Sequence, residues 1–321
     1  MKKSKVLILG ANGQIGTVLS KTLKNIYGSS AVISSDIRPS QTNDGPFELI
    51  NVLDRNRIDE VIEKYHVNQI YHLAAILSAN GEKAPLKTWD INMNGLFNVL
   101  EAARKYNINK VFYPSSIAVF GPNVPADQTP QESSLIPTTV YGMSKLAGEN
   151  WANYYFNRYG LDVRSLRYPG IIGYQSMPGG GTTDYAVDIY HEAIKKGKYN
   201  CFLKEDTALP MIYMDDAIRA TLELMEADAD KISIRTSYNL SGMSFTPKEI
   251  AEEIQKVQPD FEISYSPDFR QEIADSWPNS LDDSAARNDW GWSEKYNLSS
   301  MTIDMLEKLK EKYRQEDSLI H

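Results

Sequence analysis

Short apolar runs alternate with longer amphipathic segments through the first half of the chain. The short runs are rich in Val, Ile, Leu or Tyr and too short for helices, so they predict β-strands. We place these strands at residues 5–9, 31–35, 47–50, 69–73 and 111–114. Strands that are apolar on both faces are typical of the centre of a parallel sheet, with helices covering each face.

The segments between these strands carry apolar residues near helical spacing and predict helices at 14–26, 54–65 and 86–106. A strand followed by a helix and then by another strand makes a right-handed crossover unit. Several such units in succession favour an α/β fold with a doubly wound parallel sheet of the Rossmann type.

The pattern changes in the second half. A helix at 141–159 and a strand at 161–166 continue the alternation, but beyond Pro169 loops rich in Gly, Pro, Ser and Asp prevail. Four helices are predicted there, at 184–196, 215–226, 247–257 and 302–314. We therefore expect a dinucleotide-binding domain over 1–170 and a smaller α/β substrate-binding lobe over 171–321. Segments of this lobe are expected to interleave with the sheet and to close over its carboxyl edge.

Composition narrows the possible functions. The chain has 321 residues, a hydrophobic fraction of 42% and a formal charge of −8 without a basic cluster, so nucleic acid is not an expected partner. No run approaches the roughly 20 apolar residues of a membrane helix. The single cysteine, Cys201, excludes a disulfide framework and a multi-cysteine metal site, and it favours a cytoplasmic location. We expect no metal.

A glycine-rich turn follows the first predicted strand and opens the first helix. Its glycines, Gly10, Gly13 and Gly16, permit a tight turn, close approach of a pyrophosphate and close packing of helix on strand. The helix N-terminus adds free N–H groups and partial positive charge. We expect the cofactor to contact Gly10, Asn12, Gly13, Gln14, Ile15 and Gly16.

Asp36 lies 20 residues beyond Gly16, at the end of the second predicted strand. A carboxylate there accepts hydrogen bonds from ribose hydroxyls and repels a 2′-phosphate, so NAD is favoured over NADP. Arg38 leaves the alternative open, because an arginine can accommodate that phosphate; we expect it beside the adenine or in solvent. Asp54 has two readings, a helix cap or an adenine contact.

Tyr141 and Lys145 are four residues apart and so share one face of a helix. An ammonium near a phenol favours the phenolate, which makes Tyr141 a candidate for proton exchange with a substrate hydroxyl. Spacing alone is weak evidence. It gains weight from Ser115 and Ser116, which stand at the carboxyl end of the fifth predicted strand.

Taken together, these motifs resemble the extended branch of the short-chain dehydrogenase/reductase family. The matching segments are 10–16, Asp36, 71–75, 92–95, 115–121 and the Tyr141-x-x-x-Lys145 motif. The resemblance implies that Ser116 polarises the substrate oxygen, with Ser115 close enough to share that task. It also implies that Tyr141 is the acid/base and that Lys145 holds the nicotinamide ribose. Further cofactor contacts are expected from Leu73, Ala74, Ala75, Asn92, Tyr168, Pro169 and Ile171.

Nucleotide-sugar epimerases and dehydratases of the same branch are the leading alternative. Those enzymes usually carry an arginine that grips the diphosphate, shortly before a segment that corresponds here to 207–217. Leu209 and Pro210 stand there instead. A buried diphosphate needs cationic or bidentate partners, so this departure favours a smaller substrate.

The chain also resembles the short-chain-type L-threonine 3-dehydrogenases, and this resemblance covers nearly its whole length. It is most distinctive in four segments, 166–172, 178–186, 208–211 and 274–278. That resemblance implies oxidation of the threonine C3 hydroxyl by NAD to 2-amino-3-oxobutanoate. It also implies a homodimer in which the helices at 86–106 and 141–159 of two subunits form a four-helix bundle.

An amino-acid substrate needs donors for its carboxylate and acceptors for its ammonium. The segment 179–183 precedes a helix whose N–H groups can take the carboxylate. Asp184 has an equally plain role as a helix cap, and Trp277 can either cover the substrate or pack within its own lobe. The expected substrate residues are Ser78, Ser115, Tyr141, Gly180, Thr182, Thr183, Asp184 and Trp277.

Two other classes fit the sequence less well. A zinc-dependent medium-chain threonine dehydrogenase needs several Cys, His or Glu ligands, whereas this chain has one cysteine and four histidines. A non-catalytic NAD-sensing protein on the same fold tends to lose the tyrosine or the lysine, and both Tyr141 and Lys145 are present.

Overall fold

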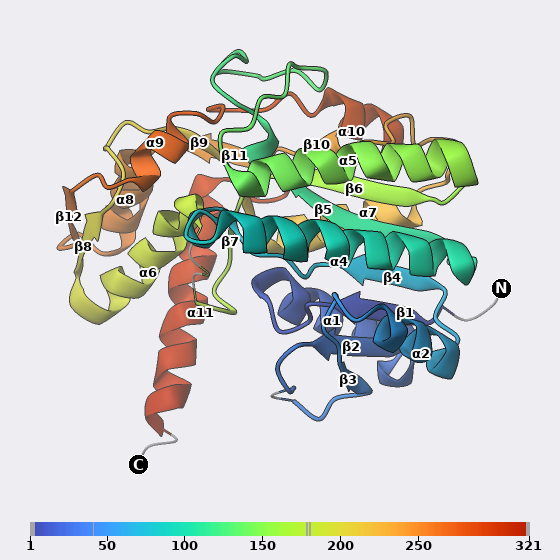
Figure 1. Ribbon diagram of the computed structural model, residues 1–321. Helices are drawn as coiled ribbons and strands as arrows, with labels where there is room; N and C mark the ends of the chain where they lie inside the picture. Colours follow the sequence, from blue (N-terminus) through green and yellow to red (C-terminus); the bar gives the residue numbers. More distant parts are fainter. Residues whose placement is uncertain (1–3, 41, 178, 180, 319–321) are drawn as a thin grey trace.

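The computed structural model describes residues 4–40, 42–177, 179 and 181–318. Its main feature is a seven-stranded sheet in the order β10-β6-β5-β4-β1-β2-β3, in which all neighbouring strands run parallel (Figure 1). The strands are β1 (Val6–Leu9), β2 (Val32–Asp36), β3 (Phe47–Leu49), β4 (Gln69–His72), β5 (Lys110–Ser116), β6 (Val163–Tyr168) and β10 (Tyr238–Asn239). The predicted Rossmann-type sheet is confirmed.

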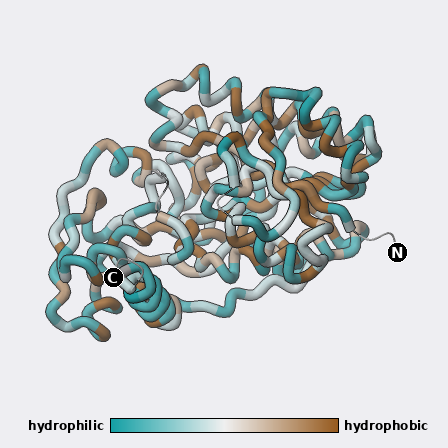
Figure 2. Tube along the Cα trace, turned by 90° about the horizontal axis from the view of Figure 1, so that it is seen from below, coloured by the Kyte–Doolittle hydropathy of each residue, from teal (hydrophilic) through white to brown (hydrophobic). Residues whose placement is uncertain are grey.

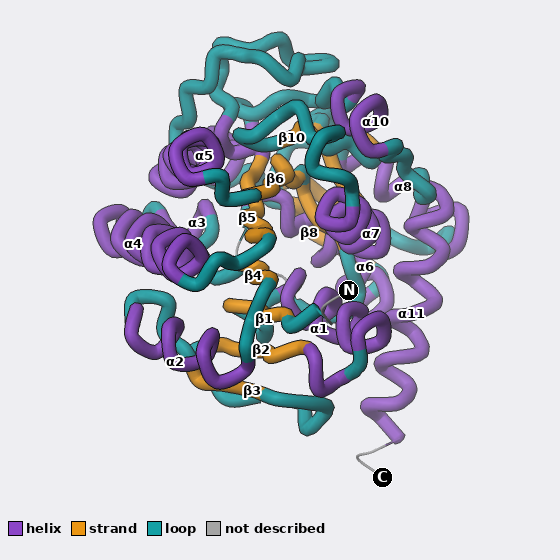
Figure 3. Tube along the Cα trace, turned by 90° about the vertical axis from the view of Figure 1, so that its right-hand side faces the viewer, coloured by secondary structure: helices purple, strands orange, loops and turns teal. Residues whose placement is uncertain are grey.

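Helices cover both faces of this sheet (Figure 3). On one face lie α2 (Arg55–Tyr65), α4 (Pro85–Lys105) and α5 (Val140–Tyr159); on the other lie α1 (Gln14–Tyr27) and α7 (Met214–Glu226). Side chains of a strand alternate between faces, so Leu7 joins the core under α2, α4 and α5, while Val6 joins the core under α1 and α7. Figure 2 shows the resulting hydrophobic interior.

A smaller lobe stands at one end of the large sheet. It holds a three-stranded sheet of β11 (Met243–Phe245), β9 (Leu209–Tyr213) and β7 (Gly170–Ile172), and a pair of β8 (Lys198–Cys201) and β12 (Glu262–Tyr265). Its helices are α6 (Tyr185–Lys196), α8 (Pro247–Val257), α9 (Arg270–Ala274), α10 (Ser284–Trp290) and α11 (Leu298–Ser318). Strand β10, which belongs to the large sheet, follows β7, β8 and β9 in the chain and precedes β11 and β12. The lobe is therefore not one uninterrupted segment.

The strands of this lobe are absent from the sequence prediction. Alternating residues of β8 and β12 are exposed, and each strand has only four residues, which leaves too little pattern to separate a strand from a loop. The short helices α3 (Ser78–Gly81), α9 and α10 were missed for the same reason. The long elements were located correctly, although β5 extends to Ser116 rather than to residue 114.

A long loop between β5 and α5 reaches the lobe. Thr129 forms an isolated parallel bridge with Leu281, and backbone hydrogen bonds join Asn279 to Ala126. The loop over 121–139 therefore holds the segment 276–282, which carries Trp277. In the described part of the chain, no helix is both long enough and apolar enough to cross a membrane.

Candidate active site

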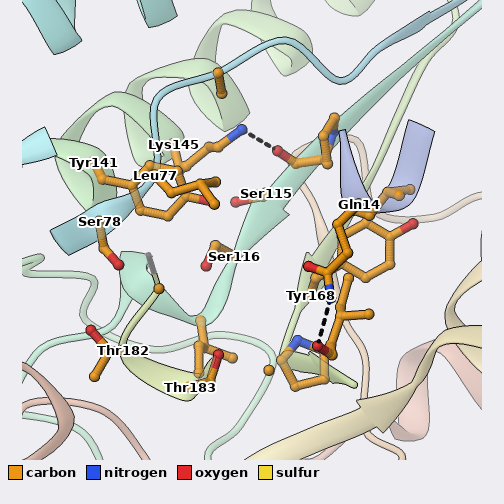
Figure 4. A pocket seen from close by; sticks show the side chains of 18 of the residues that line it. Gln14, Leu77, Ser78, Ser115, Ser116, Tyr141, Lys145, Tyr168, Thr182 and Thr183 are labelled. Atoms are coloured by element: carbon orange, nitrogen blue, oxygen red, sulfur yellow. Dashed lines mark hydrogen bonds between the residues drawn. The ribbon is translucent and has the colours of Figure 1, made fainter. Parts of the chain in front are cut away.

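A cavity of about 140 Å³ opens at the carboxyl edge of the large sheet, where it meets the smaller lobe (Figure 4). The first turn of α1 lines it together with the loop after β4, the end of β5, the first turns of α5, the segment 168–171 and the segment 181–184. Its lining residues include Gln14, Ile15, Leu73, Ala75, Ser78, Ser115, Ser116, Tyr141, Lys145, Tyr168, Pro169, Ile171, Thr182, Thr183, Asp184 and Trp277. The structure thus brings most of the predicted site residues into one place.

The start of α5 sets the position of Tyr141. Thr139 caps the helix by accepting a hydrogen bond from the Gly142 N–H at 3.0 Å, so Tyr141 stands in the first turn at the cavity wall. Ser116, at the end of β5, lines the same cavity as Tyr141, and its hydroxyl lowers the pKa of the Tyr141 phenol. Lys145, one turn further along α5, places Nζ 5.5 Å from the centroid of the Tyr141 ring.

Lys145 is held in a buried, mostly apolar position. Its Nζ donates a hydrogen bond of 2.7 Å to the Pro114 carbonyl and lies 4.7 Å from the centroid of the Tyr113 ring. Burial lowers the pKa of Lys145 to about 7, against the opposing charge of Glu149. The lysine is therefore poised to change charge near neutral pH.

The Tyr141 hydroxyl is protonated in the protein alone. Burial raises the pKa of Tyr141 to about 12, and the hydrogen bond from Ser116 opposes this rise. Spacing alone suggested that the lysine would lower this pKa. In the structure, removal of the hydroxyl from water is the larger effect, and the pKa rises instead.

Ser115 and Ser116 differ in their surroundings. Ser115 is 2% exposed, and its hydroxyl donates a hydrogen bond of 2.6 Å to Glu149 on α5. Because a carboxylate only accepts, the Ser115 proton is committed to Glu149. Arg167 on β6 donates two hydrogen bonds to the same carboxylate. Sequence reasoning missed Glu149 and Arg167, although the position of Glu149 four residues after Lys145 was an available signal.

The glycine-rich turn forms a cradle of bare backbone. Gly10 has a φ of +89°, and a Cβ there would lie 2.8 Å from the Ala74 nitrogen; a Cβ on Gly16 would lie 2.2 Å from the Gly10 carbonyl oxygen. Glycine is needed at both positions. Helix α1 starts after Gly13 without a side-chain cap, so the backbone N–H groups of its first turn are available to bind an anion such as a phosphate. This geometry fits a dinucleotide.

Asp36 ends β2 beside this cradle. Its carboxylate accepts hydrogen bonds from the backbone N–H groups of Asn12 at 3.1 Å and Arg38 at 3.2 Å. The Asn12 side chain donates to the Arg38 carbonyl, which fastens the loop after β2 to the cradle. The Arg38 side chain itself is 71% exposed. Arg38 thus lies mainly in solvent, with its Nε 3.8 Å from Asp36.

The side chains of two predicted cofactor residues, Asp54 and Asn92, form hydrogen bonds within the protein and do not line the cavity. The Asp54 carboxylate accepts the Arg57 N–H at 3.1 Å and caps α2, which is the simpler of its two readings. The Asn92 side chain bonds to both backbone groups of Ile76 and to the Ser144 hydroxyl. It fastens the loop after β4 to α5 and does not line the cavity.

The far wall of the cavity has unsatisfied polar groups. The hydroxyl of Thr182 and the indole N–H of Trp277 are buried and have no hydrogen-bond partner among the described residues. Asp184 accepts the Gly181 N–H at 2.7 Å and so closes the loop, with no side-chain cap on α6. Gly180 lies outside the described residues. Lining residues that the sequence did not single out are Leu77, Pro114, Ile117, Gly170 and Gly181.

The arrangement of the described histidines and acidic residues does not indicate a metal-binding site. In the parts of the chain that the structure describes, no group of three or more His, Cys, Asp or Glu side chains is arranged to hold an ion. Burial lowers the pKa of His72 to about 3, so this residue is a neutral core histidine in β4.

A model of the NAD dependent epimerase/dehydratase family matches residues 6–240. The chain belongs to this family, and NAD is its cofactor.

Individual relatives cover nearly all of the chain. An uncharacterized epimerase/dehydratase of Staphylococcus haemolyticus is 49% identical over 313 residues, which are 96% of this chain and 98% of the relative. The structure of an L-threonine dehydrogenase from Cupriavidus necator in its holo form is 56% identical, with a TM-score of 0.94 over 95% of this chain and 99% of that one. The structure of a monomeric L-threonine 3-dehydrogenase from a metagenome, in its apo form, is 49% identical. Its TM-score is 0.93, and the match covers 95% of this chain and 99% of that one.

Replacing Asp36 by Asn is expected to weaken NAD binding about 10- to 100-fold, because a hydrogen bond to a charged group contributes about 1.5–3 kcal/mol. Calorimetric titration with NAD and with NADP measures the effect. Loss of the charge should reduce the preference for NAD over NADP. Equal weakening of both cofactors would instead assign Asp36 a purely structural role in the loop.

Proposed function

We propose that this protein oxidises the C3 hydroxyl of L-threonine to 2-amino-3-oxobutanoate with NAD. The observation that carries the proposal is the cavity that brings Ser116, Tyr141 and Lys145 to the first turn of α1, directly after the glycine-rich cradle. The solved L-threonine dehydrogenases that this chain resembles over almost its full length support the choice of substrate.

The size and the lining of the cavity suit a small amino acid. Its volume of about 140 Å³ lies below the ~300–1,000 Å³ typical of pockets for drug-sized ligands. The unpartnered hydroxyl of Thr182 and the indole N–H of Trp277 can serve the substrate carboxylate. Ser78, Thr183 and the Asp184 carboxylate add further polar groups around the same space.

In the proposed mechanism, the threonine hydroxyl lies between Ser116 and Tyr141. Ser116 donates a hydrogen bond to the reacting oxygen, and ionised Tyr141 takes its proton. Lys145 favours that ionised form by its charge. NAD, when bound, supplies the hydride acceptor. Because burial raises the pKa of Tyr141 to about 12 and lowers the pKa of Lys145 to about 7, oxidation should accelerate as the pH rises to about 7 and level off above it, where Lys145 loses its charge.

Epimerase or dehydratase activity on a nucleotide sugar is the alternative that the family description keeps open. Leu209 and Pro210 occupy the place where such enzymes usually carry a diphosphate-binding arginine, and both are buried in β9. This observation favours threonine.

The first test is NADH absorbance after mixing the protein with NAD and, separately, L-threonine, D-threonine, L-allo-threonine, L-serine or a UDP-sugar. We expect reduction of NAD with L-threonine and little with NADP. Conversion of the UDP-sugar without threonine oxidation would move the assignment to the epimerases. No reaction with L-threonine under either cofactor would overturn the proposal.

Tyr141→Phe removes only the hydroxyl that takes the proton. We expect kcat for L-threonine to fall by about 10²–10⁴-fold, since that is the usual contribution of general acid–base catalysis. NAD affinity, measured by titration, should remain close to the wild-type value. A variant with near-normal turnover would reject Tyr141 as the base.

We also propose that the protein is a homodimer through α4 and α5, which lie side by side on the outside of the molecule (Figure 1). Three large side chains of these two helices are 39–47% exposed: Trp89 on α4, and Trp151 and Tyr154 on α5. Aromatic side chains are enriched at protein interfaces. The single, buried Cys201 supports a cytoplasmic location, which is likewise a proposal.

Analytical ultracentrifugation tests the dimer. We expect a mass twice the 36.2 kDa of the chain, and a monomer for Trp151→Glu, because a charge would have to be buried in the interface. Ile303→Glu, an equal change at an exposed position of α11, should leave the dimer intact. A monomeric wild-type protein at micromolar concentration would contradict the proposal and match the monomeric relative.

A further inference from the structure

A buried carboxylate stands one helical turn beyond the lysine of the active site. Glu149 is 1% exposed and lies four residues after Lys145, on the same face of α5. Its charge acts on Lys145. An ionised group in such a place is costly unless it is paired and hydrogen-bonded.

Glu149 meets that condition fully. Arg167 grips it from β6 with two hydrogen bonds, Nε to Oε1 at 3.0 Å and Nη2 to Oε2 at 2.9 Å. Ser115 adds a third from β5, at 2.6 Å. These three donors from two strands fix the position of the carboxylate on the face of α5 that also carries Lys145.

Arg167 is fixed in turn by groups outside the cavity. Its Nη1 donates to the Gln131 carbonyl and to Asn239 Oδ1, both at 3.0 Å. Asn239 donates to the carbonyls of Thr129 and Asp282, next to the segment that carries Trp277. The carboxylate therefore cannot move without breaking hydrogen bonds of a network that joins α5, β5, β6 and β10.

Lys145 has few other charged neighbours. Tyr141 shares its helix, Tyr113 faces it from β5, and both carry phenols whose pKa burial raises. His72 on β4 is neutral, and the charge of Lys145 helps to keep it so. Among the described residues, Glu149 is the carboxylate whose charge acts on Lys145.

We propose that Glu149, held in place by Arg167 and Ser115, is a positioning residue whose negative charge favours the ammonium form of Lys145 beside Tyr141. Glu149 does not line the cavity, so it acts only through Lys145. The consequence for turnover rests on the proposed oxidation of L-threonine. The consequence for Lys145 itself does not.

The direction of the effect follows from the sign of the charges. A nearby anion favours the ammonium, so its removal lets Lys145 lose its proton at lower pH. Less ammonium means less stabilisation of the ionised Tyr141. Glu149→Gln keeps the shape of the side chain and removes the charge, so it is the variant of choice.

The test is an NMR titration of protein labelled with ¹³C at the lysine Cε, with the Lys145 signal assigned by its loss in Lys145→Arg. We expect the titration midpoint of Lys145 to fall by about one pH unit or more in Glu149→Gln. An unchanged or higher midpoint would overturn the proposal. This readout needs no substrate, so it stands even if L-threonine is not oxidised.

Kinetics then tests the consequence in the same variant. With L-threonine and NAD at pH 8, kcat should fall about tenfold while KM for L-threonine changes little, because the residue does not touch the substrate. A rise in KM with unchanged kcat would show that Glu149 shapes the pocket instead, and would contradict its role through Lys145.

The chain offers a matched control. Asp162 forms a similar ion pair with Arg164 at the other end of β6, with N and O 2.8 Å apart. Asp162→Asn should leave both the Lys145 midpoint and kcat unchanged. If it lowers them as much as Glu149→Gln does, the effect is a general loss of structure and the proposal fails.

A double variant covers the case in which Glu149→Gln does not fold. Glu149→Leu combined with Arg167→Met removes both charges, a replacement that buried ion pairs often tolerate. The Lys145 midpoint should still fall, though less, because the more distant positive charge is lost as well. A midpoint equal to the wild-type value in a folded double variant would overturn the proposal.

Discussion

The burial of a lysine amine against the end of β5 is the constraint on which the rest of the site depends. Lys145 keeps its place because its Nζ donates a hydrogen bond to the Pro114 carbonyl and lies over the Tyr113 ring. Both partners lie on the strand that ends in Ser116. The packing of α5 on β5 that buries the lysine therefore also sets the distance between the serine and the tyrosine. Stability and chemistry share one set of contacts here.

The two serines at the end of β5 have different partners. Ser116 turns to Tyr141 and the cavity, whereas Ser115 turns to a carboxylate in the interior. Adjacent residues of a strand point in opposite directions, so two serines in succession serve two different partners. This division explains why a pair of identical residues need not share one function, and why the second serine is the candidate for contact with substrate.

Much of the fold could be predicted from the sequence, because buried parallel strands and long helices leave strong periodic patterns. The site was predictable where a mechanism ties residue type to position, as with Gly10, Gly16, Asp36 and the Tyr141/Lys145 pair. Contacts between distant segments were not. Glu149 and Arg167 meet only after β6 has aligned beside β5, and no local pattern marks an ion pair across such a distance. Asp54 is the local case, since the cap of α2, one of its two predicted roles, depends only on neighbouring residues.

The loop over 121–139 connects the strand that ends in Ser116 with the helix that carries Tyr141, and it also bridges to Leu281 beyond Trp277. A single surface excursion thus joins the reacting groups to the wall that encloses the substrate. Two residues of the same loop are tied to the proton-transfer groups: Thr139 caps α5, and the Gln131 carbonyl accepts a hydrogen bond from Arg167. For directed evolution of substrate range, the exposed positions between these anchors are therefore the ones to vary, and the length of the loop is best kept.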